Sequence, residues 1–389
     1  MRVNKMKPNT DFPSVLLFSS EYPPHIWGGL GTHVRHLAEE LSRKNIKGLL
    51  FTMPSDLPEA EFEGNHSFTI VRPGKSTETH ENVYEWIMNM NYMWIQSLNI
   101  LQPPFDLIHA HDWMTAGAAI FAKNMYNKPL IATIHSLECG RKKELRTASE
   151  KRIHETEMKL IRSADHLIAC SRFMKNELIL AGAEESKISV IPNGAAPFEA
   201  QESNPPLLHP YVFTMGRFVP EKGFEELIHA FAEVKAAYSS LKLVIAGEGP
   251  GKKTYDLLTE NLGIQEDVIF PGFIKGELLN NYIQYASLAC IPSHYEPFGL
   301  AALELMSAGK PLIGSGAGGL SELISHNRTG IVCESSRIDC LYKSMMDLLD
   351  DPQKARMLGE NAKKESGKYS WSKMAHHTLS VYKIALQQM

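Results

Sequence analysis

Short apolar runs alternate with amphipathic helical segments along nearly the whole chain, and this alternation constrains the fold more than any other feature of the sequence. The run "SVLLFSS" at 14–20 is followed, after a loop, by "LGTHVRHLAEELSRKN", whose apolar residues recur at helical spacing. Further apolar runs, with helical segments between most of them, are "IKGLLFT", "FDLIHAH", "PLIATIH", "HLIACS" and "ISVIPN". Strands that alternate with helices are typical of a parallel sheet covered on both faces. The sequence therefore predicts an α/β fold.

The segment 194–210, "GAAPFEAQESNPPLLHP", interrupts this alternation with four prolines and no periodicity. The pattern then restarts with "YVFTMG" and continues through "LKLVIAG", "DVIFPG", "SLACIPS", "KPLIGS" and "GIVCE". A chain of 389 residues is also long for one core. We therefore expect two Rossmann-like domains, over 1–200 and 205–370. The last amphipathic helix, 369–386, has no strand after it.

The composition narrows the class of protein and its partners. The formal net charge of −4 gives no basic field for nucleic acid. The first residues, 1–24, lack the long apolar run of a signal peptide, and no stretch has the eighteen or more apolar residues of a membrane span. Any membrane contact is therefore expected to be peripheral. The cysteines form no zinc-type cluster, and we interpret them as buried thiols of a cytoplasmic protein; they are Cys139, Cys170, Cys290, Cys333 and Cys340.

A glycine-rich turn, "EYPPHIWGGLGTHV" at 21–34, lies between the first strand and the first helix. Gly28, Gly29 and Gly31 would let backbone amides approach a phosphate at the helix N-terminus. The dinucleotide fingerprint is incomplete, because an eight-residue loop intervenes and "LLFTMPS" offers no acid after the second strand. A hydride-transfer cofactor is therefore not expected. A mere tight turn remains the alternative.

A basic pair follows the first strand of the second domain, in "GRFVPEKG" at 216–223. Arg217 offers a planar fork and Lys222 a mobile point charge, a combination that suits a diphosphate. The alternative is a solvated basic loop in which these residues pair with Glu221.

Two glutamates, Glu296 and Glu304, stand in the apolar stretch "HYEPFGLAALELMSAGKP" at 294–311. A helix is expected from about Gly299 to Gly309, so that the amides of Phe298 to Leu300 form a helix end that can bind an anion. Both glutamates could reach a ligand there. The alternative is a dipole-stabilising acid and an exposed helix acid, although the apolar neighbours of Glu304 leave little polar face.

Histidines follow two adjacent strands of the first domain, in "HAHDW" at 109–113 and "IHSLE" at 134–138. His111 and His135 could hydrogen-bond a sugar or transfer a proton, although a histidine at such a place is often structural.

Taken together and in this order, the motifs resemble glycosyltransferase family 4, whose members have the GT-B fold of two Rossmann-like domains with parallel sheets facing across a cleft. The resemblance covers nearly the whole chain and is strongest over 211–335, where "GRFVPEKG", "YEPFGLAALELMSAGKP" and "GGLSELI" occur. It implies a retaining hexosyltransferase that uses a nucleotide sugar, a UDP-hexose or UDP-N-acetylhexosamine, with no bound metal and no other cofactor.

The resemblance also implies roles for individual residues. Glu296 resembles the glutamate that contacts the donor sugar near its 3-hydroxyl, and Glu304 the one that holds the ribose. Arg217 and Lys222 are similar to the pair that neutralises the diphosphate. Donor contacts through the backbone are implied for Gly28, Gly29, Phe298, Gly299 and Leu300. His111 resembles the histidine near the donor's 6-hydroxyl and the reacting carbon. The helix around Trp371, 371–389, is expected to complete the first domain.

Two motifs depart from the family spelling, because "NGAA" at 193–196 lacks the usual aspartate and Ser321 replaces a proline. Neither departure touches the charged donor residues. The metal-free mechanism agrees with the absence of an Asp-x-Asp motif. A retaining glycosidase would instead need two carboxyl groups about 5–5.5 Å apart around the sugar bond.

The acceptor is expected to be a small soluble polyol, a cyclitol or aminocyclitol as in antibiotic biosynthesis, or a saccharide, with His135 and Arg141 on its side. A polysaccharide or glycogen-synthase-like glucosyltransferase is an alternative, as are a nucleotide-sugar epimerase and a non-catalytic sugar-nucleotide-binding protein. The basic segment 141–162 could meet an anionic acceptor or a membrane surface, but a solvated helix face is the preferred interpretation. Its basic residues are Arg141, Lys142, Lys143, Arg146, Lys151, Arg152, Lys159 and Arg162.

Overall fold

The computed structural model describes residues 13–57, 60–65, 67–75, 79–142, 144–334 and 337–388. Lys143 and the first twelve residues, on which part of the basic-segment and signal-peptide predictions rest, lie outside these ranges. The chain divides into two compact units. Unit 1 runs to Asn193 and includes the C-terminal segment from Trp371, and unit 2 is Gly194–Ser370.

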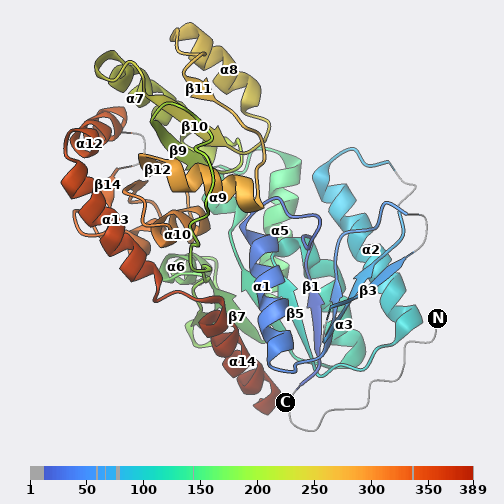
Figure 1. The fold of residues 1–389 in the computed structure, drawn as a ribbon. Helices are drawn as coiled ribbons and strands as arrows, with labels where there is room; N and C mark the ends of the chain where they lie inside the picture. Colours follow the sequence, from blue (N-terminus) through green and yellow to red (C-terminus); the bar gives the residue numbers. More distant parts are fainter. Residues whose placement is uncertain are drawn as a thin grey trace. The chain divides into compact units, whose positions relative to one another are not determined.

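Unit 1 is built around an eight-stranded sheet with the order β3-β4-β2-β1-β5-β6-β7-β8 (Figure 1). Its strands are β1 (Val15–Phe18), β2 (Gly48–Phe51), β3 (Glu61–Asn65), β4 (Phe68–Arg72), β5 (Leu107–His111), β6 (Leu130–Ile134), β7 (His166–Ala169) and β8 (Ile188–Val190). All neighbours pair in parallel except β3 and β4, which form an antiparallel edge. The sequence pattern did not predict these two strands, because an antiparallel edge pair needs no helix between its strands.

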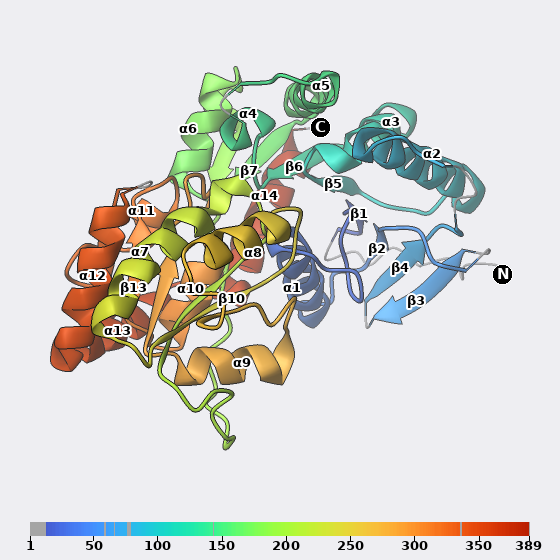
Figure 2. The ribbon, with the colours of Figure 1, turned by 90° about the horizontal axis from the view of Figure 1, so that it is seen from above.

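Helices cover both faces of this sheet. They are α1 (Gly29–Arg43), α2 (Val83–Leu101), α3 (Ala116–Tyr126), α4 (Glu138–Arg141), α5 (Ala148–Ser163), α6 (Arg172–Leu180) and α14 (Trp371–Gln387), with short 3₁₀ turns η1 (Trp113–Thr115) and η2 (Glu185–Lys187). Helices α2, α3 and α5 pack against one another, and α14 packs against α1 (Figures 1 and 2). A capping box between Thr147 and Glu150 fixes the start of α5.

Unit 2 has a six-stranded parallel sheet with the order β11-β10-β9-β12-β13-β14. Its strands are β9 (Tyr211–Met215), β10 (Lys242–Ala246), β11 (Val268–Ile269), β12 (Leu288–Ile291), β13 (Leu312–Ser315) and β14 (Ile331–Cys333). Its helices are η3 (Pro220–Lys222), α7 (Phe224–Ala237), α8 (Lys252–Asn261), α9 (Gly276–Tyr285), α10 (Leu300–Ser307), α11 (Leu320–Leu323), α12 (Ile338–Asp350) and α13 (Pro352–Ser366). Helix α7 packs with α8 and α12, whereas α10 packs with α13. The expected α/β class with two largely parallel sheets is confirmed.

The central strands of both sheets are apolar on both faces, as parallel strands between helix layers must be, whereas the edge strand β3 is polar. Strands β1, β5 and β6 are buried throughout. In unit 2 the core continues from β9 and β10 to the apolar faces of α7 and α12. Because parallel strands end at one edge, the residues that follow β5 and β6 lie together, and so do those that follow β9 and β12.

The prediction that all five cysteines are buried thiols is wrong. Cys333, at the end of β14, and Cys340, in the first turn of α12, form a disulfide with their Cα atoms 5.7 Å apart. Cys139 is exposed, and Cys170 and Cys290 are buried free thiols. The two cysteines are seven positions apart, a spacing that matches no short cysteine motif, and the strand-to-helix connection brings them together. Among the described residues, no helix combines the length and apolar character that crossing a membrane requires.

Candidate active site

In unit 2 an ion pair joins the loops that follow β9 and β12. The Lys222 Nζ lies 2.7 Å from the Glu296 Oε2, and the Ser293 hydroxyl donates to the same oxygen at 3.3 Å. The side chains of Lys222 and Glu296 are 24% and 12% exposed, so the pair is largely screened from water. Two motifs that lie 74 residues apart in the sequence thus share one site.

Arg217 lies in the same connection between β9 and α7 as Lys222, with its side chain 58% exposed. Its nearest acid is Glu221, at 3.9 Å from the guanidinium. The alternative interpretation was a solvated basic loop in which both residues pair with Glu221. Arg217 does pair with Glu221, but Lys222 pairs with Glu296 instead. An exposed guanidinium held only loosely can turn to an anionic ligand at little cost.

Backbone contacts fix the two loops against each other. Gly223 has a φ of 67°, and a Cβ at this position would lie 2.3 Å from the carbonyl oxygen of Pro292. The amide of His294 donates to the carbonyl of Glu221 at 2.8 Å, and the His294 ring pairs with Glu226 at 3.0 Å. The position of Lys222 relative to Glu296 is therefore set by the backbone and not by the flexible lysine side chain.

Helix α10 begins after Gly299, whose φ of 104° favours glycine. A Cβ on Gly299 would lie 2.6 Å from Leu320, and Phe298 is buried beside the turn. The Glu296 carbonyl accepts the amide of Gly319 at 2.8 Å. The predicted anion-binding segment from Phe298 to Leu300 is thus a rigid start of a helix.

Glu304 lies one turn into α10. Burial raises the pKa of its carboxyl to about 7, and among the described residues no side chain or amide donates to that carboxylate. The Glu304 side chain is half-buried and not enclosed, so a ligand can reach its carboxyl, and ribose hydroxyls are suitable donors.

In unit 1 the glycine-rich turn is organised by Glu21. One carboxylate oxygen, Oε2, accepts the amides of Trp27, Gly28 and Gly31 at 3.0, 3.2 and 3.3 Å. A Cβ on Gly31 would lie 2.8 Å from that oxygen, so Gly31 leaves the room that Glu21 needs. A phosphate could use the amides of Gly28 and Gly31 only by displacing Glu21. Gly29 is the first residue of α1, directly after this contact.

His111 and His135 lie side by side at the ends of β5 and β6, as the strand order predicts. The His111 Nδ1 is 3.3 Å from the His135 Nε2, and their rings stack with centroids 5.6 Å apart. A third ring, which was not predicted, belongs to His33 of α1, and its centroid lies 4.7 Å from that of His135. Its signal was present, because His33 is a polar residue on the buried face of an amphipathic helix.

All three imidazoles are uncharged at neutral pH. Burial, together with repulsion from His135, lowers the pKa of His33 to about 3. Burial lowers the pKa of His135 to about 4 and that of His111 well below its ordinary value. Such rings can accept a hydrogen bond or a metal ion but cannot act as cations.

Asp112, which was also not predicted, joins the end of β5 to the loop after β6. It is buried, has a φ of 58°, and its Oδ1 accepts the amide of His135 at 2.7 Å. Burial raises the pKa of this carboxyl to about 6. A non-glycine residue in such a backbone conformation is typical of functional sites.

Arg141 is engaged by acids of its own unit. Its guanidinium lies 2.7 Å from Glu138 and 3.5 Å from Glu157, and its side chain is 20% exposed. Both carboxylate oxygens of Glu157 also accept the amide of Glu138, at 2.9 and 3.0 Å. Burial raises the pKa of Glu157 to about 8. Arg141 thus holds α4 to α5.

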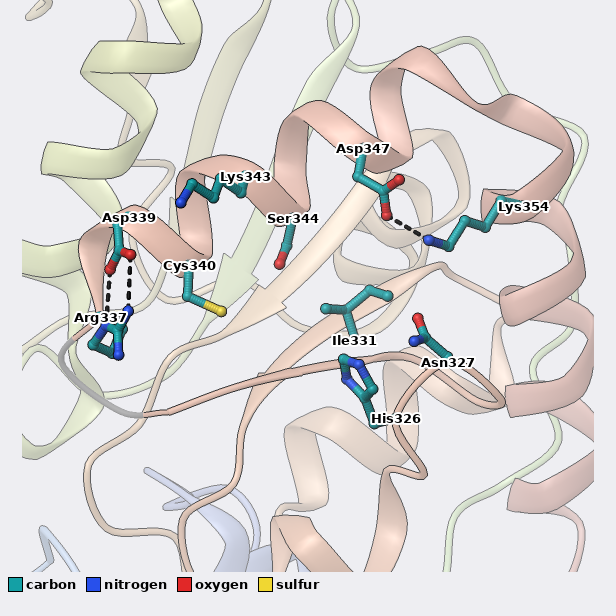
Figure 3. Close-up of a pocket in the computed structure, with 10 residues that line it drawn as sticks. All are labelled: His326, Asn327, Ile331, Arg337, Asp339, Cys340, Lys343, Ser344, Asp347 and Lys354. Atoms are coloured by element: carbon teal, nitrogen blue, oxygen red, sulfur yellow. Dashed lines mark hydrogen bonds and ion pairs between the residues drawn. The ribbon is translucent and has the colours of Figure 1, made fainter.

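A hollow of about 440 Å³ lies in unit 2 near α12, and Figure 3 shows its lining. It contains none of the predicted site residues. Most of its charges pair with each other, Arg337 with Asp339 at 2.9 Å and Lys354 with Asp347 at 2.6 Å. The hollow therefore offers few free charges to a nucleotide sugar.

Comparison with known protein families identifies the class of enzyme to which the chain belongs. Residues 27–197 match the family described as "Glycosyltransferase Family 4", and residues 196–365 match "Glycosyl transferases group 1". The chain belongs to glycosyltransferase family 4 and is a glycosyltransferase.

Two relatives and two solved structures show how far the similarity extends. An uncharacterized glycosyltransferase of Methanocaldococcus jannaschii, MJ1607, is 34% identical over 96% of this chain and 99% of its own. The glycogen synthase of Mycobacterium tuberculosis is 31% identical over 95% of this chain and 94% of its own. The sucrose-phosphate synthase of Thermosynechococcus elongatus matches the structure with a TM-score of 0.83 at 23% identity, over 97% of this chain and all of that one. The structure of Anabaena HepE with UDP-glucose matches with a TM-score of 0.74 at 19% identity, over 95% of this chain and 99% of that one. The fold is GT-B.

Proposed function

We propose that this glycosyltransferase is a retaining enzyme that moves a hexosyl or N-acetylhexosaminyl unit from a UDP-sugar to a hydroxyl group of a small soluble acceptor. The observation that carries the proposal is the Lys222–Glu296 pair, with the exposed Arg217 in the same connection as Lys222. It combines cations for a diphosphate with a carboxylate for sugar hydroxyls at the ends of parallel strands. HepE, with the same fold, binds UDP-glucose.

In the proposed mechanism, the charge that develops on the leaving diphosphate is stabilised by Arg217, Lys222 and the first amides of α10. Glu296 orients the sugar, and Glu304 accepts hydrogen bonds from the ribose. The acceptor hydroxyl attacks from the face of the departing group, and its proton passes to the leaving phosphate oxygen. This scheme uses no metal ion, and we propose His111 as the residue of unit 1 that hydrogen-bonds the reacting sugar.

For the acceptor we propose a polyol, cyclitol, aminocyclitol or saccharide. Arg141 does not select an anionic acceptor in this scheme, because Glu138 and Glu157 already engage its guanidinium. A glycogen-synthase-like activity is the second candidate, and the 31% identity to the Mycobacterium tuberculosis enzyme over nearly the whole chain favours it.

The test measures UDP release and product mass over a panel of UDP-sugars and acceptors, including oligoglucan. Release that depends on a small acceptor supports the proposal, and extension of oligoglucan supports the second candidate. Arg217→Met and Lys222→Met should each lower acceptor-dependent release at least tenfold. The exposed Arg356 and Lys253 of the same unit provide matched controls. Conversion of the donor without an acceptor would indicate an epimerase and would contradict both candidates.

A further inference from the structure

Two of the four histidines grouped at the ends of β5 and β6, His33 and His111, each hold a ring nitrogen with unmet bonding capacity. His109 is satisfied at both ring nitrogens, by Tyr382 and Thr133 at 2.7 Å each. In contrast, the Nε2 atoms of His33 and His111 are fully buried and find no hydrogen-bond partner among the residues that the structure describes. A buried nitrogen without a partner is uncommon in folded proteins and calls for an explanation.

The geometry points to a metal site. We propose that His33, His111 and His135 bind a divalent transition metal ion, with Zn²⁺ as the expected ion. One ring nitrogen from each residue lies within 4.8 Å of a nitrogen of both others. Tetrahedral zinc with bonds of about 2.0–2.1 Å needs separations of about 3.4 Å. The His111 Nδ1 and the His135 Nε2 are already 3.3 Å apart, so His111 would bind through Nδ1, and the His33 nitrogen must approach by at most about 1.4 Å.

The surroundings of His33 prepare it as a ligand. Its Nδ1 donates to the amide oxygen of Asn193 at 2.7 Å. An amide oxygen only accepts, so the proton is on Nδ1 and the lone pair is on Nε2, inside the cluster. Ligating histidines commonly show this arrangement, with the second nitrogen held by a carbonyl-type acceptor.

The donor set selects the kind of ion. Three neutral imidazoles without a thiolate suit Zn²⁺, Co²⁺, Ni²⁺ and Cu²⁺, whereas Mg²⁺ and Ca²⁺ prefer oxygen ligands. Three protein ligands leave a fourth position open. The buried carboxylate of Asp112, which accepts the amide of His135 at 2.7 Å, supplies negative charge nearby. His135 is only half-buried, which gives the ion a path from solvent.

Binding there would occupy the lone pair of His111 and inhibit transfer, a consequence that rests on the proposed function. The ion is thus an inhibitor and not a cofactor of the proposed reaction. The site itself stands on the geometry of unit 1 and does not depend on the reaction.

The experiment titrates the chelator-treated full chain with Co²⁺ and follows visible absorption, with Zn²⁺ as the displacing ion. We expect one Co²⁺ per chain and competition by Zn²⁺ but not by Mg²⁺. His33→Gln should abolish the signal, and Asn193→Ala should weaken binding about 10–100-fold. Replacement of the exposed His377 by Ala is the control and should change nothing.

Circular dichroism checks that each variant folds. If His33→Gln does not fold, His135→Asn, at a half-buried position, replaces it and should also abolish the Co²⁺ signal. Binding that is absent in the wild type, or equal in the wild type and the histidine variants, overturns the proposal. UDP release in chelator tests the proposed function separately. If the wild type binds Co²⁺ but shows no acceptor-dependent UDP release in chelator, the proposed function is contradicted and the metal site is not.

Discussion

Replacing Lys222 by Met should separate the structural role of the Lys222–Glu296 pair from its role in catalysis. The substitution keeps most of the side-chain volume but leaves the carboxylate of Glu296 without its cation. Glu296 would retain the Ser293 hydroxyl at 3.3 Å, which is a weak replacement for a charged partner at 2.7 Å.

The magnitude follows from the burial of the pair. Breaking a fully buried pair costs about 3–5 kcal/mol, and breaking an exposed pair costs about 0–1 kcal/mol. With side chains 24% and 12% exposed, this pair lies between these limits, so we expect a loss of about 1–3 kcal/mol. For a unit of this size each kcal/mol lowers the Tm by about 2–4 °C. Loss of one cation at the leaving group should lower kcat by about 10²–10³-fold.

The double variant Lys222→Met with Glu296→Gln provides the critical comparison. It removes the unpaired charge, so the Tm should return to within about 2–4 °C of the wild type, an offset of roughly 1 kcal/mol. Transfer should stay low, because the diphosphate still lacks its cation. The assays are differential scanning calorimetry and acceptor-dependent UDP release, with Lys253→Met as the control. If the double variant regained wild-type transfer, or Lys222→Met kept it, the assignment of Lys222 to the diphosphate would be refuted.

The remaining predictions concern Glu304, the glycine loop and Glu157. The pKa of Glu304 is about 7, so its carboxyl ionises between pH 6 and pH 8. Because the ionised form accepts the ribose hydroxyls, the affinity for UDP in calorimetric titrations should rise about tenfold over this range. If the affinity of Glu304→Gln depended on pH in the same way, this role would be excluded. Gly31→Ala, whose Cβ would crowd Glu21, should destabilise the protein by about 1–2 kcal/mol in thermal unfolding. Gly28→Ala is the matched control, because none of the described atoms lies within 4 Å of the added Cβ, and it should change stability by less than about 0.5 kcal/mol. Equal losses of stability in the two variants would contradict the packing argument. Because the pKa of Glu157 is raised to about 8 in the fold, its contribution to stability is most favourable at low pH and is lost as pH rises from about 4.5 to 8. Glu157→Gln should therefore flatten the fall in Tm between pH 5 and pH 8. If the Tm of the variant fell with pH as steeply as that of the wild type, the raised pKa would be contradicted.

The sequence by itself determined the layers of the fold and the places where chemistry occurs. Apolar periodicity predicted the strands on either side of α1 and α7, because a parallel strand between helix layers must be apolar on both faces. The rule that ligands meet the carboxyl ends of parallel strands placed Lys222 and Glu296 in loops after strands and His111 at a strand end. These properties depend on neighbouring residues, so a linear pattern is enough to predict them.

The tertiary structure decided which residues meet. Lys222 and Glu296 are 74 positions apart, and their contact depends on the pairing of β9 with β12, which side-chain periodicity does not encode. The group of His33, His111 and His135 likewise requires α1 to pack beside the ends of β5 and β6. The acceptor of the glycine-loop amides proved to be Glu21, because whether a carboxylate fits there depends on a space of a few ångströms beside Gly31. Contacts between distant segments depend on strand order and packing, and only the folded chain specifies them.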